Sequence, residues 1–170
     1  MKCSLIITTY IYTTAQIGDQ CWFSENCRYL SEISAVNEES IIDPHYYVYD
    51  YDGTDTQAAK SSIQYETYGV LYNWAAVING NICPNGWHIP SDTEWMILET
   101  SLGMSDSESQ STDWRGTDQG YQMKSMNGWY NNENGSNSSE FDGIPGGYRY
   151  SGGFSNEEYS GYWWANTELN

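Results

Sequence analysis

The chain has few basic residues, and this shortage limits the partners that it can have. Its 170 residues include 6 Lys and Arg against 23 Asp and Glu, so the formal net charge is -17 at pH 7. Nucleic acids and anionic membrane surfaces are bound through cationic surfaces, so the composition argues against both. An acidic balance of this size suits a well-solvated secreted or surface protein, and carboxylates are ligands that Ca²⁺ prefers.

Long apolar runs are also missing. No apolar stretch approaches the ~18 residues that a membrane-spanning helix needs, so we expect no membrane insertion. Residues 1–7 carry one positive charge and an apolar run too short for a signal peptide. If the protein is exported, we therefore expect its export signal to lie outside this sequence. A length of 170 residues predicts one domain with a real core.

The four cysteines form no C-x-x-C pair, which excludes a zinc ribbon and a thioredoxin motif. Cys83 and His88 are the only local Cys/His pair, and two ligands do not make a zinc site. We expect an oxidising compartment and structural disulfides. Cys21 and Cys27 are close enough in sequence to pair, but the sequence does not fix the connectivity.

Aromatic residues are abundant and unevenly distributed, with 16 Tyr and 8 Trp against 3 Phe. They predict a core of aromatic rings whose polar ends find partners. Together with 16 Gly and many Ser and Asn, they are typical of loop-rich recognition surfaces, and equally of loop-rich folds without a ligand. Tyr47, Tyr49 and Tyr51 alternate along an expected strand at 45–51. They would form either a sugar platform or, as we prefer, one face of a half-buried strand.

The surest element is a helix over 91–102. Ser91 is its expected N-cap, and Glu94 completes a capping box. Trp95 begins an apolar face with helical spacing, and Gly103 is suited to end the helix. We further expect a strand-turn-strand over 10–22, helices over 24–33 and 67–78, and strands over 121–125 and 159–165. Short strands, two main helices and long ordered loops make an α+β fold.

The sequence offers little for catalysis. His88 is interpreted as a structural histidine, His45 is expected to be exposed, and no Gly-x-Ser-x-Gly elbow is present. We therefore predict no catalytic residue and no enzyme activity. Two candidate Ca²⁺ sites remain: Asp50, Asp52 and Asp55, whose spacing departs from an EF-hand loop, and the 131–142 loop with Asn134 and Asp142.

Five ordered blocks resemble the Fibrobacter succinogenes major paralogous domain family. They are IGDQCWFSEN (17–26), YGVLYNWAAV (68–77), CPNGWHIPSDTEW (83–95), FDGIPGGYR (141–149) and GYWWANTE (161–168). The third block contains the residues that we take as the family's structural motif: Cys83, Trp87, His88, Pro90, Ser91, Glu94 and Trp95. On this basis we divide the chain into an N-terminal strand region, 1–16, and the family domain, 17–170.

The resemblance implies a C-type-lectin-like fold of the formylglycine-generating-enzyme type, on secreted or surface proteins of Bacteroidetes, Fibrobacter and marine bacteria. No catalytic residue is established for the family, and the cysteine pair late in the chain of the related enzyme has no counterpart here. Members usually continue into a Gly-Phe-x-x-Arg-Cys segment, so the resemblance implies a truncated copy. If that final cysteine pairs with the family's counterpart of Cys83, then Cys83 lacks its usual partner.

Three functions stay open. The preferred one is a non-enzymatic extracellular binding or adhesion module for a glycan or a protein. The second is a structural protein used for surface display or self-assembly, and the third, given the least weight, is a polysaccharide hydrolase. The sequence specifies neither the ligand nor an oligomeric state.

Overall fold

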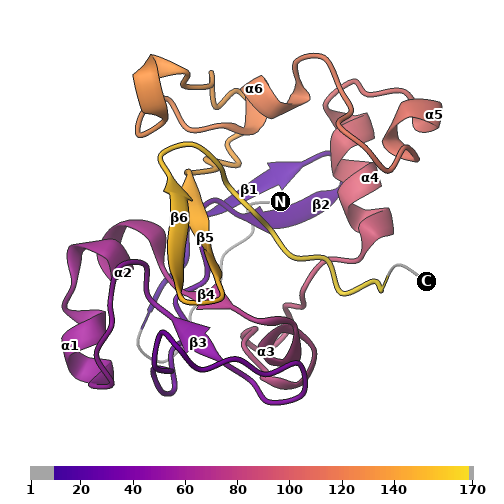
Figure 1. Cartoon of the computed structure of the whole chain (residues 1–170). Coiled ribbons are helices and arrows are strands. Elements are labelled where there is room, and N and C mark those ends of the chain that lie inside the picture. Colours follow the sequence, from indigo (N-terminus) through magenta and orange to yellow (C-terminus); the bar gives the residue numbers. More distant parts are fainter. Residues whose placement is uncertain (1–9, 169–170) are drawn as a thin grey trace. The chain divides into compact units, whose positions relative to one another are not determined.

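The computed structural model describes residues 10–168 (Figure 1). The chain divides into two compact units. Unit 1 contains Met1–Glu25, Pro90–Ile144 and Ala165–Asn170, and unit 2 contains Asn26–Ile89 and Pro145–Trp164. Helices and small antiparallel sheets are mixed throughout, so the α+β prediction is confirmed. Between residues 10 and 168, the helices lack the length and the apolar character that a membrane span needs.

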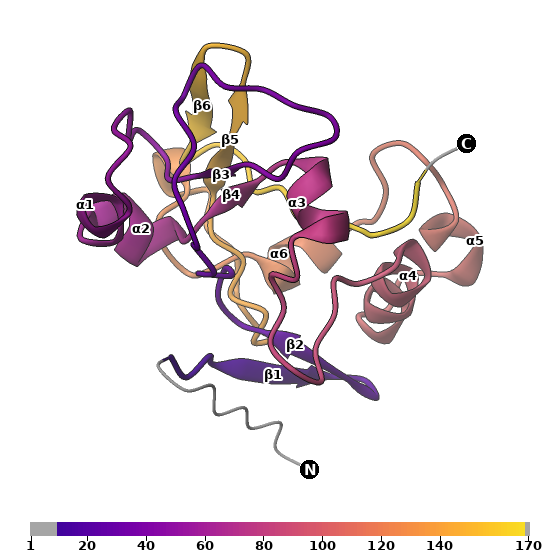
Figure 2. The same cartoon turned by 90° about the horizontal axis from the view of Figure 1, so that it is seen from below.

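Unit 1 begins with a hairpin of β1 (Thr14–Ile17) and β2 (Gln20–Phe23), side by side in Figures 1 and 2. The turn uses Gly18 at φ 57°, a conformation in which glycine has no Cβ to clash. Thus the strand-turn-strand prediction is confirmed, with the hairpin over 14–23 instead of 10–22. The hydrophobic core cluster of this unit contains Ala15, Ile17, Trp22, Leu98 and Phe141, against which Trp95, Leu102 and Met123 pack.

The predicted capping box is present at the start of α4 (Asp92–Ser101). Ser91 Oγ accepts a hydrogen bond from the Glu94 backbone N–H at 3.3 Å, and Glu94 Oε2 accepts one from the Ser91 N–H at 2.8 Å. Both bonds satisfy donors that a helix start otherwise leaves open. The helix is followed by Gly103 at φ 98°, as predicted. It buries Leu98 completely in the core of unit 1.

The rest of unit 1 is loop with three short helices: α5 (Asp106–Ser109), α6 (Gln119–Met123) and η1 (Tyr130–Asn132). The strand expected over 121–125 is therefore wrong. The carbonyl oxygens of residues 121 to 124 each accept a backbone N–H from the loop that returns over 136–143. Because this loop satisfies the acceptors at the end of α6, the segment is stable as a helical turn without a partner strand.

Unit 2 contains β3 (Tyr46–Tyr47) paired with β4 (Leu71–Tyr72), and the hairpin of β5 (Gly146–Tyr150) and β6 (Gly153–Glu157). Its helices are α1 (Thr56–Lys60), α2 (Ile63–Tyr68) and α3 (Trp74–Asn79). The buried core comprises Leu30, Ile33, Tyr46, Val48, Ala59, Val70, Ala76 and Ile82. The cores of the two units therefore contain small aliphatic residues as well as the expected aromatic ones.

Three expected elements of unit 2 are wrong. The helix over 67–78 is interrupted, because Gly69 takes φ 73° and the Val70 N–H bonds to the Cys27 carbonyl oxygen at 3.1 Å. The helix over 24–33 is absent, because polar side chains of this segment bond to α2 instead. Asn26 donates to the Tyr68 carbonyl oxygen and Arg28 donates to the Tyr65 carbonyl oxygen. The buried strand over 159–165 is also absent, and most of that segment is exposed coil.

Candidate binding site

Strand β5 directs side chains to two surfaces of unit 2. Tyr148 and Tyr150 face one side of the β5–β6 hairpin and Arg149 faces the other, because successive strand residues alternate. On the Arg149 side, the neighbouring Phe154 of β6 packs on Tyr49, with ring centroids 5.1 Å apart. The hairpin therefore carries an inner face against the body of unit 2 and an outer face of tyrosines.

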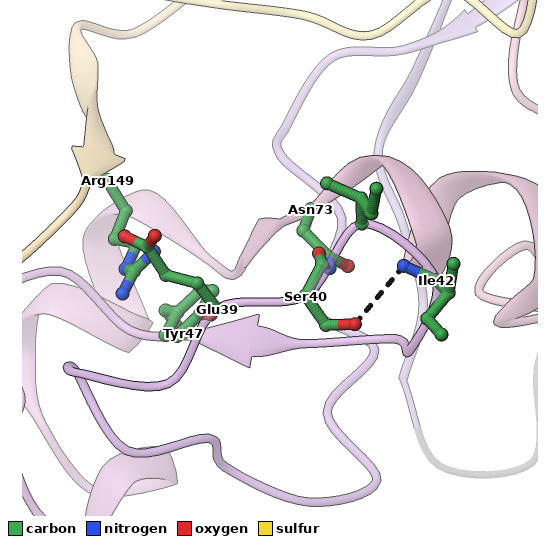
Figure 3. A pocket seen from close by; sticks show the side chains of 7 residues that line it. Glu39, Ser40, Ile42, Tyr47, Asn73 and Arg149 are labelled. Carbon is green, nitrogen blue, oxygen red and sulfur yellow. Dashed lines mark hydrogen bonds and ion pairs between the residues drawn. The ribbon is translucent and has the colours of Figure 1, made fainter.

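A pocket of about 590 Å³ lies beside the inner face, lined by Glu39, Ser40, Ile41, Ile42, Tyr47, Asn73 and Arg149 (Figure 3). Figure 3 shows Arg149, Glu39 and Tyr47 together at one end and Ser40, Asn73 and Ile42 at the other. The pocket is therefore built from the loop before β3, from β3 itself, from the start of α3 and from β5.

The polar end is held together by Arg149. Its Nη2 donates to the carbonyl oxygens of Val36 at 2.5 Å and Glu38 at 2.9 Å, and its Nη1 forms an ion pair with Glu39 at 3.1 Å. The guanidinium also lies over the ring of Tyr47, whose hydroxyl donates to the Glu38 carbonyl at 2.6 Å. Burial raises the pKa of Tyr47 despite the nearby cation, so the hydroxyl stays protonated and acts as a donor.

The other end is fixed by Asn73, the N-cap of α3. Its Oδ1 accepts the backbone N–H groups of His45 at 2.8 Å and Ala76 at 3.0 Å. Its Nδ2 donates to the carbonyl oxygens of Ser40 and Asp43. One side chain thus caps a helix and anchors the loop that forms the pocket rim. On that rim Ile41 and Ile42 are 89% and 75% exposed.

The outer face carries a second feature, the tyrosine cluster of Tyr148, Tyr150 and Tyr162. The ring centroid of Tyr148 lies 6.1 Å from that of Tyr150 and 5.3 Å from that of Tyr162. Tyr150 and Tyr162 are 51% and 61% exposed, while Tyr148 is half-buried between them. Contacts among the rings hold large apolar faces in place at the surface, with phenol groups beside them.

The candidate Ca²⁺ ligands fall in both units. Asp50, Asp52 and Asp55 lie in unit 2, and the Asp55 carboxylate accepts the N–H groups of Gln57 and Ala58 as the N-cap of α1. In unit 1, Asn134 Oδ1 accepts the Trp129 N–H, and Asp142 takes φ 53°. Between residues 10 and 168, no three or more His, Cys, Asp or Glu side chains are grouped to hold a metal ion. Ca²⁺ binding stays a prediction.

The structural motif is divided between the units. Pro90, Ser91, Glu94 and Trp95 belong to unit 1, where Trp95 packs on Trp22 with ring centroids 4.7 Å apart. Cys83, Trp87 and His88 belong to unit 2, where Trp87 is half-buried and His88 exposed.

The interpretation of His45 as exposed is wrong. Its side chain is half-buried, and its ring is stacked on Tyr47 at a centroid distance of 6.0 Å. Tyr47 itself is buried, and Tyr49 and Tyr51 are half-buried, which supports the half-buried interpretation of this segment over a sugar platform. The strand that we expected over 45–51 is limited to Tyr46–Tyr47, and Asp50 at φ 54° turns the chain after it.

The prediction of structural disulfides is confirmed for one of the described cysteines. Cys21 is disulfide-bonded, whereas Cys27 and Cys83 carry thiols. A Cys21–Cys27 disulfide, one of the pairings left open by the sequence, is therefore not formed.

Sequence reasoning missed the pocket and the tyrosine cluster. The 37–44 segment belongs to none of the elements that the sequence predicts, yet it supplies much of the pocket rim. A usable signal was Arg149, one of 6 basic residues in a strongly acidic chain, since its positive charge needs acceptors nearby. For the cluster, the signal was the alternation of Tyr148 and Tyr150 on either side of Arg149.

Comparison with known proteins agrees with the five sequence blocks. No curated protein and no solved structure shows a significant match to the chain. A family model described as the Fibrobacter succinogenes major domain matches residues 15–170. The chain belongs to this family.

Proposed function

We propose that this chain is a non-enzymatic binding or adhesion module of a secreted or cell-surface bacterial protein, with a glycan as its favoured ligand and a protein as the alternative. The observation that carries the proposal is the tyrosine cluster of unit 2. Pyranose rings have apolar C–H faces that stack on aromatic rings, and their hydroxyls bond to phenol groups. Tyr150 and Tyr162 offer both chemistries at the surface, and their contacts with Tyr148 reduce the entropy lost on binding.

We further propose that the α+β architecture is of the C-type-lectin-like, formylglycine-generating-enzyme type. Support comes from the Pro90, Glu94 and Trp95 pattern at the start of α4, and from small antiparallel sheets joined by long loops. In such an architecture, loops and short hairpins on a fixed body present the binding residues. The β5–β6 hairpin and the 159–164 segment have this role here.

A glycan array, with and without Ca²⁺, tests the proposal. We expect binding to one class of glycan, and we expect Tyr150→Ala and Tyr162→Ala each to weaken it about tenfold, the effect of losing ~1.4 kcal/mol. Tyr121→Ala is the matched control, because Tyr121 is 57% exposed in unit 1 and should leave binding unchanged.

A silent array would contradict the glycan proposal. Capture of a purified surface protein that depends on the same two tyrosines would favour the protein ligand instead. Light scattering that rises with concentration, in the absence of any ligand, would favour the self-assembly alternative. Polysaccharide hydrolysis that is lost in a folded His88→Ala variant would contradict the non-enzymatic proposal.

A further inference from the structure

Unit 2 contains two cysteine thiols that the proposed function does not use. Cys27 lies in the segment that follows β2, and Cys83 lies in the loop after α3. Both side chains are half-buried. The sequence separates them widely, so any reaction between them depends on the fold.

The fold brings the two cysteines to one place. The Cys27 Sγ lies 3.7 Å from the carbonyl oxygen of Ile82, the residue directly before Cys83. Since a single peptide bond joins Ile82 to Cys83, the Cys27 sulfur lies within a few ångströms of the Cys83 backbone.

Both residues are attached to the core cluster of unit 2, Cys83 by side-chain packing and Cys27 by a backbone hydrogen bond. The Val70 N–H donates to the Cys27 carbonyl oxygen, Val70 and Ile82 are buried in the cluster, and Cys83 packs against it. Their positions are therefore fixed by core packing rather than by a mobile loop.

Electrostatics agrees with this proximity. Burial, and in second place the neighbouring Cys27, raises the pKa of the Cys83 thiol to about 11. An influence of one thiol on the other requires that the two groups lie close together. Cys83 therefore stays protonated at neutral pH, and the thiolate is the reactive form of cysteine. We accordingly assign the first attack on an oxidant to Cys27.

We propose that Cys27 and Cys83 form an oxidation site whose substrate is a disulfide oxidant, such as oxidised glutathione, and whose product is an internal Cys27–Cys83 disulfide. The Cys27 thiolate attacks one sulfur of the oxidant, whose S–S bond breaks to leave a mixed disulfide and one free thiol. Cys83 then loses its proton and attacks the Cys27 sulfur, releasing the second thiol. Two protein thiols are oxidised and one oxidant disulfide is reduced, so electrons and protons balance.

The product would constrain unit 2. It would close a loop from residue 27 to residue 83 that contains β3, β4 and the helices α1 to α3. Long loops lose much entropy in the unfolded state when they are cross-linked. We therefore expect the oxidised protein to melt several degrees above the reduced one.

The experiment treats the full native chain with oxidised glutathione and maps the peptides without reduction. Cleavage after Glu25 and Glu32 separates Cys27 from Cys21, so the cross-linked fragment identifies its own cysteines. We expect one fragment that joins Cys27 to Cys83, two hydrogens lighter than the separate thiols, and a Tm gain that a thiol reductant reverses.

Single variants test the order of attack. Cys83→Ser should stop at a Cys27–glutathione adduct, and Cys27→Ser should react at least tenfold more slowly. The double serine variant gives the Tm of a folded form that cannot be cross-linked. The proposal is overturned if each cysteine carries its own glutathione, if the cross-link forms only in denaturant, or if Cys27 joins Cys21.

Discussion

The guanidinium carbon of Arg149 lies 4.6 Å from the centroid of the Tyr47 ring, and this contact joins β5 to β3 within unit 2. The same guanidinium binds two carbonyl oxygens and the Glu39 carboxylate. Its side chain is only 11% exposed, whereas the side chain of Glu39 is 50% exposed, so the guanidinium is held mainly from the protein side of the pocket. A buried planar cation with three acceptors is a geometry that lysine cannot reproduce.

We predict that Arg149→Lys lowers the free energy of unfolding by about 2–3 kcal/mol, because at least one charge-assisted hydrogen bond and the ring contact are lost. Urea unfolding followed by tryptophan fluorescence measures the change. Lys60→Arg, at the end of α1, is the control and should be close to neutral. If Arg149→Lys is as stable as the wild type, the stability of the protein does not depend on the several hydrogen bonds that the planar guanidinium makes.

The capping box of α4 gives a second prediction. Ser91→Ala removes the acceptor for the Glu94 backbone N–H, and we expect a loss of about 1 kcal/mol, the usual cost of deleting an N-cap. Thr93 is exposed in the same turn, so Thr93→Ala should be neutral or slightly stabilising. Thermal unfolding of both variants measures the difference, and equal melting temperatures would contradict the role of the box.

Gly69 gives a third prediction, because a side chain there meets two obstacles. Its φ of 73° strains any residue with a Cβ, and that Cβ would lie 2.7 Å from the Cys27 carbonyl oxygen. Gly86 has a similar φ of 85° but nothing within 4 Å, so Gly86→Ala measures the cost of a positive φ without a steric contact.

We expect Gly86→Ala to cost about 1 kcal/mol and Gly69→Ala at least ~2 kcal/mol, since only the latter must also displace backbone. Chemical denaturation of the two variants gives both values. If the two substitutions cost the same, the contact with Cys27 contributes nothing, and the break between α2 and β4 has another cause.

Glu157 gives a prediction on pH. Burial raises its pKa, the nearby carboxylates of Glu158 and Asp50 raise it further, and the Tyr68 hydroxyl opposes the shift. A carboxyl whose pKa is higher in the folded state favours folding while it is protonated, and this contribution is lost as the pH rises through the folded-state pKa. Ionised Glu157 therefore destabilises the fold at neutral pH.

We expect Glu157→Gln to raise the Tm by about 2 °C at pH 7 and to have no such advantage below about pH 4, where the wild-type carboxyl is protonated. Glu133→Gln is the control, because Glu133 is exposed in unit 1 and the substitution removes the same charge. Scanning calorimetry at several pH values measures both. A Tm gain that is equal for the two variants would assign the effect to net charge alone.

Local interactions were readable from the sequence. The box of Ser91 and Glu94 closes within one helical turn, and the β1–β2 hairpin turns on Gly18 and Asp19 between adjacent strands. In both cases the residues that form hydrogen bonds are neighbours in the chain, so the local sequence is enough to predict the structure. Membership of the family was readable for a related reason, since its blocks are short and continuous.

The sequence by itself thus determined the capped helix, the first hairpin, the α+β class and the acidic surface. Only the tertiary structure decided that residues 67–78 break into helix, strand and helix, because the Cys27 carbonyl that accepts the Val70 N–H is distant in the chain. The tertiary structure also placed Tyr162 against Tyr148, and Arg149 against Val36 and Glu38. Such contacts depend on which distant segments pack together in three dimensions, and the periodicity of residues along the chain does not predict this.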